Sequence, residues 1–166
     1  MNDLPEIEEI RENWNKVIEN VNDSARKAGR DPADIKVMAV TKTHPEELIR
    51  RACEAGIFTF GENYAQELRD KEDYFRNRTN YDIEWHFIGH LQSNKVKYLA
   101  PFVDMIHGVE SLKLLKTINK EGAKNERIID CLLQFHIASE DTKFGLDEKD
   151  TEEILKSDQY AEMSNV

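Results

Sequence analysis

The chain alternates between short apolar runs and amphipathic helical patterns, and this alternation limits the folds that it can adopt. A helical pattern at residues 5–28 comes first, and strand–helix pairs then follow at intervals of about 20 to 28 residues. Such alternation is typical of a parallel sheet whose strands are joined by right-handed crossover helices. The predicted strands are 35–40, 57–60, 83–89, 103–107 and 127–138, and the predicted helices after the first are 46–56, 62–75, 93–101, 112–122 and 147–158.

Length and charge narrow the class of protein. The 166 residues fit one domain spanning 1–166. The net charge of −10 opposes a phosphate backbone, so nucleic acid is not an expected partner. No apolar run approaches the ~18 residues of a membrane helix, and the acidic N-terminus is unlike a signal peptide. We therefore expect a soluble, cytoplasmic protein with no membrane partner, in which Cys53 and Cys131 are reduced thiols.

Two architectures share this alternation, an open doubly wound sheet and a (β/α)8 barrel, and both gather ligands beyond the carboxyl ends of their strands. The sequence contains neither a GxGxxG dinucleotide motif nor a P-loop. Polar groups follow every predicted strand, which favours a ring of loops around one pocket and hence the barrel. The loops are TKTHP (41–45), GENYAQEL (61–68), GHLQSNK (89–95), GVES (108–111) and SEDTKFG (139–145).

Lys42, Asn63 and His90 lie in these loops and can carry chemistry. An amine at a strand end beside apolar neighbours can be partly desolvated and attack an aldehyde, although a solvated or ion-paired lysine is the alternative for Lys42. Asn63 suits a pocket amide or a helix cap. His90 is expected in the pocket, and His86 inside the barrel on the face opposite Trp85. The two histidines do not have the spacing and third ligand that a metal site needs, so no metal is expected.

The long predicted strand 127–138 is the most apolar run and is expected to be buried on both faces. Ser111 is expected to cap the helix that follows it. Charged residues on the predicted helices, Lys95 and Lys97 among them, and Lys143 are interpreted as solvent-facing.

The loop motifs together resemble one family. AVTKTHP, FGENYAQEL, WHFIGHLQSNK, IHGVES and LLQFHIASEDTKFG occur in the order and spacing of the pyridoxal 5′-phosphate (PLP) homeostasis proteins, which are similar to the N-terminal barrel domain of alanine racemase. The resemblance implies an α/β fold, a (β/α)8 TIM-type barrel of PLP fold type III, of which this chain would hold about the first five β/α units and the N-terminal helix. It further implies PLP as cofactor, held as a Schiff base on Lys42, with Asn63 and His90 lining the pocket.

The same resemblance implies a function in intracellular PLP and vitamin B6 homeostasis without catalytic turnover, and so no catalytic residue. The family's phosphate-binding loops belong to strands six to eight, so we expect weak cofactor affinity in this chain. A racemase-type enzyme using Lys42 is one alternative. A half-barrel interaction module is another, because exposed edge strands can pair with other chains. The oligomeric state is left open.

Overall fold

The computed structural model describes residues 4–137 and 145–166, so Lys143 and most of the predicted loop 139–145 lie outside the described residues. The strands form one parallel sheet in the order β1-β2-β3-β4-β5. They are β1 (Ala39–Val40), β2 (Thr59–Glu62), β3 (Glu84–Phe87), β4 (Met105–Val109) and β5 (Asp130–Leu133). The α-helices are α1 (Ile7–Lys27), α2 (Glu46–Glu54), α3 (Ala65–Arg78), α4 (Val96–Leu99), α5 (Leu112–Lys124), α6 (Glu148–Lys156) and α7 (Asp158–Ala161), and the 3-10 helices are η1 (Pro32–Asp34) and η2 (Ser93–Lys95).

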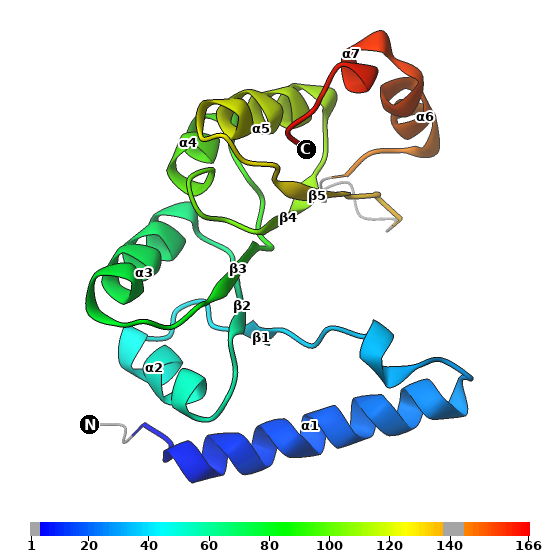
Figure 1. Ribbon diagram of the computed structural model, residues 1–166. Coiled ribbons are helices and arrows are strands. Elements are labelled where there is room, and N and C mark those ends of the chain that lie inside the picture. The colour runs from blue at the N-terminus through cyan, green and yellow to red at the C-terminus, as the bar shows by residue number, and fades with distance from the viewer. Residues whose placement is uncertain (1–3, 138–144) are drawn as a thin grey trace.

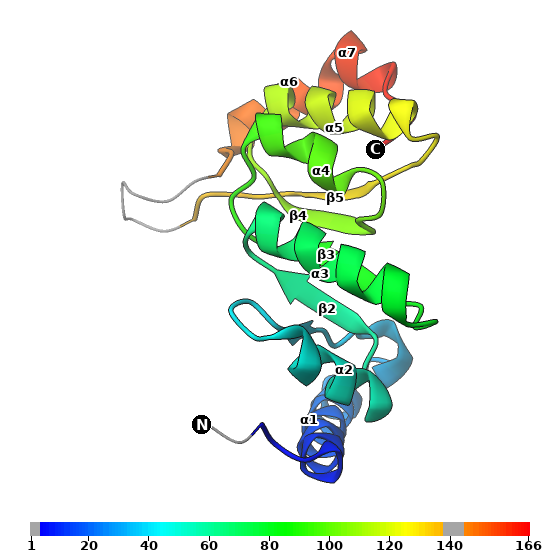
Figure 2. The same ribbon diagram turned by 90° about the vertical axis from the view of Figure 1, so that its left-hand side faces the viewer.

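The arrangement of the helices decides between the two predicted architectures. The crossover helices α2 to α5 all lie on the same side of the sheet, and each strand lies next to the one that precedes it in the chain (Figures 1 and 2). A doubly wound sheet has helices on both faces and reverses its strand order, whereas a barrel does neither. The sheet therefore has the topology of five consecutive units of a (β/α)8 barrel, as predicted.

The hydrophobic core lies between the sheet and these helices. Phe60 of β2 and Trp85 of β3 are register partners with ring centroids 5.7 Å apart, and Phe75 of α3 packs 6.3 Å from Trp85. The Trp85 indole N–H donates to Glu72 at 2.8 Å, which satisfies its polar atom. Alternation along β3 turns His86 to the opposite face, as predicted, where it is buried.

The predicted helix ends agree with the local geometry at two positions. Gly56 follows α2 with φ of +97°, a conformation that glycine adopts without steric cost. Ser111 caps α5, and its hydroxyl accepts a hydrogen bond from the Leu114 N–H at 3.2 Å. Both helix boundaries therefore follow from single residues.

Several predicted elements differ from the structure. The strand predicted at 35–40 is reduced to Ala39–Val40, and the strand predicted at 57–60 runs over 59–62, so Glu62 ends a strand instead of starting a helix. The prediction that 127–138 is buried on both faces is wrong. Ile129 is buried, whereas Ile128 and Leu132 alternate onto the opposite face of the sheet, which the helices do not cover, and are exposed (Figures 1 and 2).

The face of the sheet opposite the helices carries a chain of polar contacts. His86 Nδ1 lies 2.8 Å from His107 Nε2, and His86 Nε2 lies 3.1 Å from Glu84 Oε1, which also pairs with Lys36. Burial alone would raise the pKa of Glu84, but hydrogen bonds from Lys36, His86 and Thr59 lower it to about 2. Burial, and then the neighbouring His86, lower the pKa of His107.

The lowered pKa of His107 predicts that the protein loses stability on mild acidification. The fold disfavours the protonated imidazole, so the contribution of His107 is complete above the unfolded value of about 6.5 and is lost as pH falls below it. We expect the urea midpoint to fall between pH 7.5 and 5.5, and to fall less in a His107→Gln variant. Equal pH dependence of both proteins would contradict this assignment.

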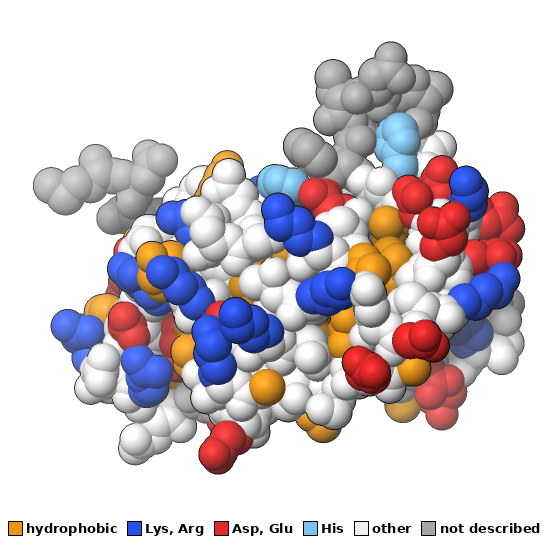
Figure 3. Space-filling view, turned by 90° about the horizontal axis from the view of Figure 1, so that it is seen from above, with side chains coloured by type: hydrophobic (Ala, Val, Ile, Leu, Met, Phe, Trp, Pro, Cys, Tyr) orange, Lys and Arg blue, Asp and Glu red, His pale blue; other side chains and the backbone are white. Residues whose placement is uncertain are grey.

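Charge is unevenly distributed over the surface. Seen from above, Lys and Arg side chains gather over one part of the molecule and Asp and Glu side chains over the opposite edge (Figure 3). The net charge of −10 is therefore compatible with locally basic surface. Within residues 4–137 and 145–166, no helix is long and apolar enough to cross a membrane.

Candidate functional site

The carboxyl ends of the parallel strands bring the predicted loops to one edge of the sheet. After β1 the chain makes a tight turn, in which the His44 N–H donates to the Thr41 carbonyl at 3.1 Å. Lys42 is the second residue of this turn, and Thr43, the third, has φ of +65°. Positive φ at the third position alone is the signature of a type II turn, where glycine is usual. The turn places Lys42 at the edge of the sheet where the carboxyl ends of the strands lie.

The Lys42 side chain is exposed, so of the two possibilities left open by the sequence the structure shows the solvated lysine and not the partly desolvated one. Lys42 lies in a turn beyond the end of β1, outside the sheet. Val40, the last residue of β1, is itself 46% exposed. The amine is therefore accessible to a ligand from solvent.

A buried ion-pair cluster beneath this turn was missed by sequence reasoning. Lys71 of α3 is only 2% exposed, and its ammonium donates to Glu62 Oε1 at 2.6 Å and to Glu67 Oε1 at 2.7 Å. It also donates to the Thr41 carbonyl at 2.8 Å. Glu67 and Lys71 have the i,i+4 spacing of ordinary surface pairs, which is the reason for their interpretation as solvent-facing. The burial of Lys71 and the partial burial of Glu67 show that this interpretation is wrong. The only sign of this cluster in the sequence was an additional carboxylate, Glu62, which the structure places at the end of β2.

Asn63 and His90 line one cavity of about 290 Å³ between the loops that follow β2 and β3. Lys95, which is partly exposed, also lines it, whereas Lys42 is not among the lining residues. The Asn63 Oδ1 atom is buried without a hydrogen-bond partner among the described residues. Tyr64, not Asn63, occupies the N-cap position of α3, so the helix-cap alternative for Asn63 is wrong.

A close backbone approach holds these two loops together. A Cβ atom at Gly89 would lie 2.2 Å from the Asn63 carbonyl oxygen, so only glycine fits there without a shift of the backbone. His90 Nδ1 also lies 3.2 Å from Glu110 Oε2. Gly89 thus couples the positions of Asn63 and His90. The contact between His90 and Glu110 connects them to the loop after β4.

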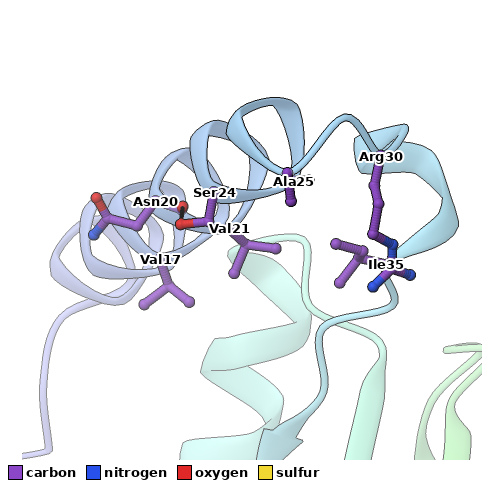
Figure 4. Close-up of a pocket in the computed structure, with 8 residues that line it drawn as sticks. Val17, Asn20, Val21, Ser24, Ala25, Arg30 and Ile35 are labelled. Atoms are coloured by element: carbon purple, nitrogen blue, oxygen red, sulfur yellow. Dashed lines mark hydrogen bonds between the residues drawn. The ribbon is translucent and has the colours of Figure 1, made fainter.

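A second hollow, of about 460 Å³, lies between α1 and the segment that leads to β1 (Figure 4). Val17, Val21 and Ser24 of α1 face Ile35 across it, and the Ser24 hydroxyl is bonded to the Asn20 carbonyl at 2.7 Å. The Ser24 hydroxyl donates to a backbone carbonyl of its own helix, and the hollow lies away from the strand ends, so it is not the candidate site. In the described part of the chain, no group of three or more His, Cys, Asp or Glu side chains could hold a metal ion.

Similarity to solved structures establishes the class of protein. The fold is similar to that of alanine racemase from Bartonella henselae, with a TM-score of 0.66 over 97% of this chain and 41% of that one, at 13% identity. The structure of PipY from Synechococcus elongatus with PLP bound is 30% identical, with a TM-score of 0.72 over 90% of this chain and 66% of that one. The chain thus has the α/β fold of the PLP fold type III barrel proteins, in the form of a partial barrel.

The sequence relatives then identify the family. The pyridoxal phosphate homeostasis protein of Pasteurella multocida is 35% identical over 147 residues, which cover 89% of this chain and 63% of that protein. The corresponding protein of Aquifex aeolicus is 34% identical over 145 residues. This chain belongs to the pyridoxal phosphate homeostasis protein family, and it spans about 63% of the length of those curated relatives. No family model matches the chain.

Proposed function

We propose that this chain binds pyridoxal 5′-phosphate through the amine of Lys42 and contributes to the homeostasis of that cofactor. The observation that carries the proposal is the exposed Lys42 in a rigidly hydrogen-bonded turn at the carboxyl end of β1. The relatives named for PLP homeostasis and the PLP-bound PipY structure support the choice of ligand.

The residues at the strand ends fit an aromatic aldehyde. The bound cofactor supplies an aldehyde that condenses with a primary amine, so that a C=N bond forms and one water leaves. Lys42 offers an accessible amine for this reaction. Asn63 offers a buried amide oxygen that has no partner among residues 4–137 and 145–166, and a donor on the ligand would satisfy it. His90, held beside Glu110, adds a polar ring to the lining of the cavity.

The proposed role is binding without turnover, and the predicted cytoplasmic location and single domain over residues 1–166 stay predictions. The racemase-type alternative rests on similarity of fold, which does not define chemistry. Chiral analysis of alanine incubated with the protein and PLP separates the two, because binding without turnover leaves the enantiomer ratio unchanged.

Selective labelling of Lys42 tests the proposal. The protein would be incubated with limiting PLP, reduced with borohydride to fix the C=N bond as an amine, and mapped by peptide mass spectrometry. We expect Lys42 to carry most of the label, because the turn holds it at the carboxyl end of β1, whereas other exposed lysines, such as Lys36, Lys124 and Lys156, are held in ion pairs.

Two single variants serve as matched controls. Lys42→Arg keeps the charge and removes the reactive amine, so it should abolish the selective label. Lys97→Arg makes the same change at an exposed lysine of α4 that does not line the Asn63 and His90 cavity, and should leave the label on Lys42 unchanged. Label spread over many lysines, or concentrated on Lys95, would refute the assignment.

A further inference from the structure

The turn that carries Lys42 is attached at both sides to one buried cluster, which consists of Glu62, Glu67 and Lys71. The Thr41 hydroxyl donates to Glu62 Oε1 at 2.7 Å, on the side that precedes Lys42. The Thr43 N–H donates to Glu67 Oε1 at 2.6 Å, on the side that follows it. Lys42 thus lies between two residues that are each bonded to a carboxylate of the cluster.

Lys71 joins these two carboxylates and the turn. An ammonium group has three N–H donors, and those of Lys71 have three acceptors, namely Glu62 Oε1, Glu67 Oε1 and the Thr41 carbonyl. Glu62 and Lys71 are almost completely buried, and Glu67 lies at the edge of the cluster with a side chain 25% exposed. Charge-assisted hydrogen bonds in a buried setting are short and directional, so the cluster fixes the path of the backbone from Thr41 to Thr43.

The backbone at Thr43 indicates that this attachment is needed. Thr43 is β-branched and has φ of +65°, a conformation that such residues rarely adopt. Strained conformations persist where surrounding contacts hold them, and they gather at functional sites. The hydrogen bond that the Thr43 N–H donates to Glu67 holds Thr43 in this conformation.

We propose that Glu62, Glu67 and Lys71 are positioning residues, which hold the turn so that the Lys42 amine faces a bound aldehyde at the carboxyl ends of the strands. The proposal rests on the proposed function of Lys42. Simple charge compensation does not account for the cluster, because Glu62 alone neutralises Lys71. The second carboxylate, Glu67, adds a bond to the backbone of the turn.

Substitution of Glu67 tests this, because its side chain is partly exposed and its loss leaves the Glu62–Lys71 pair intact. In Glu67→Ala, Thr43 N–H loses its acceptor. We expect PLP labelling of Lys42, measured by borohydride trapping relative to labelling of the other lysines, to fall about tenfold because the amine is no longer held in place. We expect the Thr43 amide to exchange with deuterium about tenfold faster by NMR.

Rescue by the conservative variant separates positioning from a general loss of stability. Glu67→Gln keeps an oxygen that accepts from Thr43 N–H, so it should restore both the labelling and the amide protection. Glu152→Ala removes the carboxylate of an exposed i,i+4 pair with Lys156 on α6, and should change neither readout. Unchanged labelling and protection in Glu67→Ala, or failure of Glu67→Gln to restore them, would overturn the proposal.

The two readouts also distinguish this proposal from the proposed function. If Lys42 of the unmodified protein takes no selective label, PLP binding through Lys42 is refuted, whereas amide exchange at Thr43 still decides whether the cluster holds the turn. Retained protection in Glu67→Ala would then overturn the positioning role as well.

Discussion

Replacement of Lys71 by methionine is expected to destabilise the protein by about 3–5 kcal/mol, the usual result of removing one partner of a buried ion pair. The substitution conserves the length of the side chain but leaves the Glu62 carboxylate, which is completely buried, without its counter-ion. Small domains are stable by only about 5–15 kcal/mol, so a loss of this size would consume much of the folding free energy. The measurement is urea denaturation followed by circular dichroism.

Two further variants check that the effect comes from uncompensated charge. In Lys71→Met with Glu62→Gln, both charges are absent, so we expect most of the lost stability to return. Lys156→Met removes the lysine of an exposed pair with Glu152 and should cost less than about 0.5 kcal/mol. A loss in Lys71→Met no larger than that in Lys156→Met would show that the buried pair contributes little.

Gly89→Ala is expected to have the next largest effect, and to act on the site as well as on stability. The new Cβ would lie 2.2 Å from the carbonyl oxygen of Asn63 and 2.9 Å from its carbonyl carbon. Because these are backbone atoms, a side-chain rotation cannot relieve the overlap, and the loops after β2 and β3 must separate. Overpacking of this kind costs about 1–3 kcal/mol. We also expect weaker retention of PLP, because Asn63 and His90 line the cavity between these loops.

Thermal denaturation and equilibrium dialysis with PLP measure the two effects. The control is Gly29→Ala, where a Cβ would meet nothing within 4 Å but the backbone has φ of +69°. That variant pays only for the unfavourable conformation, about 1 kcal/mol, and should retain PLP normally. If Gly89→Ala retains PLP as well as the unmodified protein, the close approach of the loops does not shape the binding site.

The parts of the fold that the sequence predicted are those set by local chemistry. Gly56 and Ser111 end and begin helices through backbone geometry and a single hydroxyl, and the order of strands follows from regular alternation. The strand-end loops predicted the edge at which Lys42, Asn63 and His90 lie. Whether these three residues bind the cofactor stays a prediction.

The parts that the sequence did not predict depend on contacts between distant residues. Burial of Lys71 depends on Glu62, which lies on a neighbouring strand and not on its own helix. The exposure of Leu132 depends on which face of the sheet the helices cover, and an apolar pattern does not record this. Hydrophobicity identifies the side chains that can be buried, but the arrangement of the sheet and its helices determines which of them are buried.

The cluster beneath the Lys42 turn also bears on the order in which the chain folds. Its contacts with the turn span 21, 24 and 30 residues of sequence, and they join the first two β/α units. Closing loops of this length costs little more entropy than closing shorter ones. No residue after Lys71 takes part in these hydrogen bonds. The geometry around Lys42 can therefore form during synthesis from the N-terminal part of the chain, before β4 and β5 join the sheet.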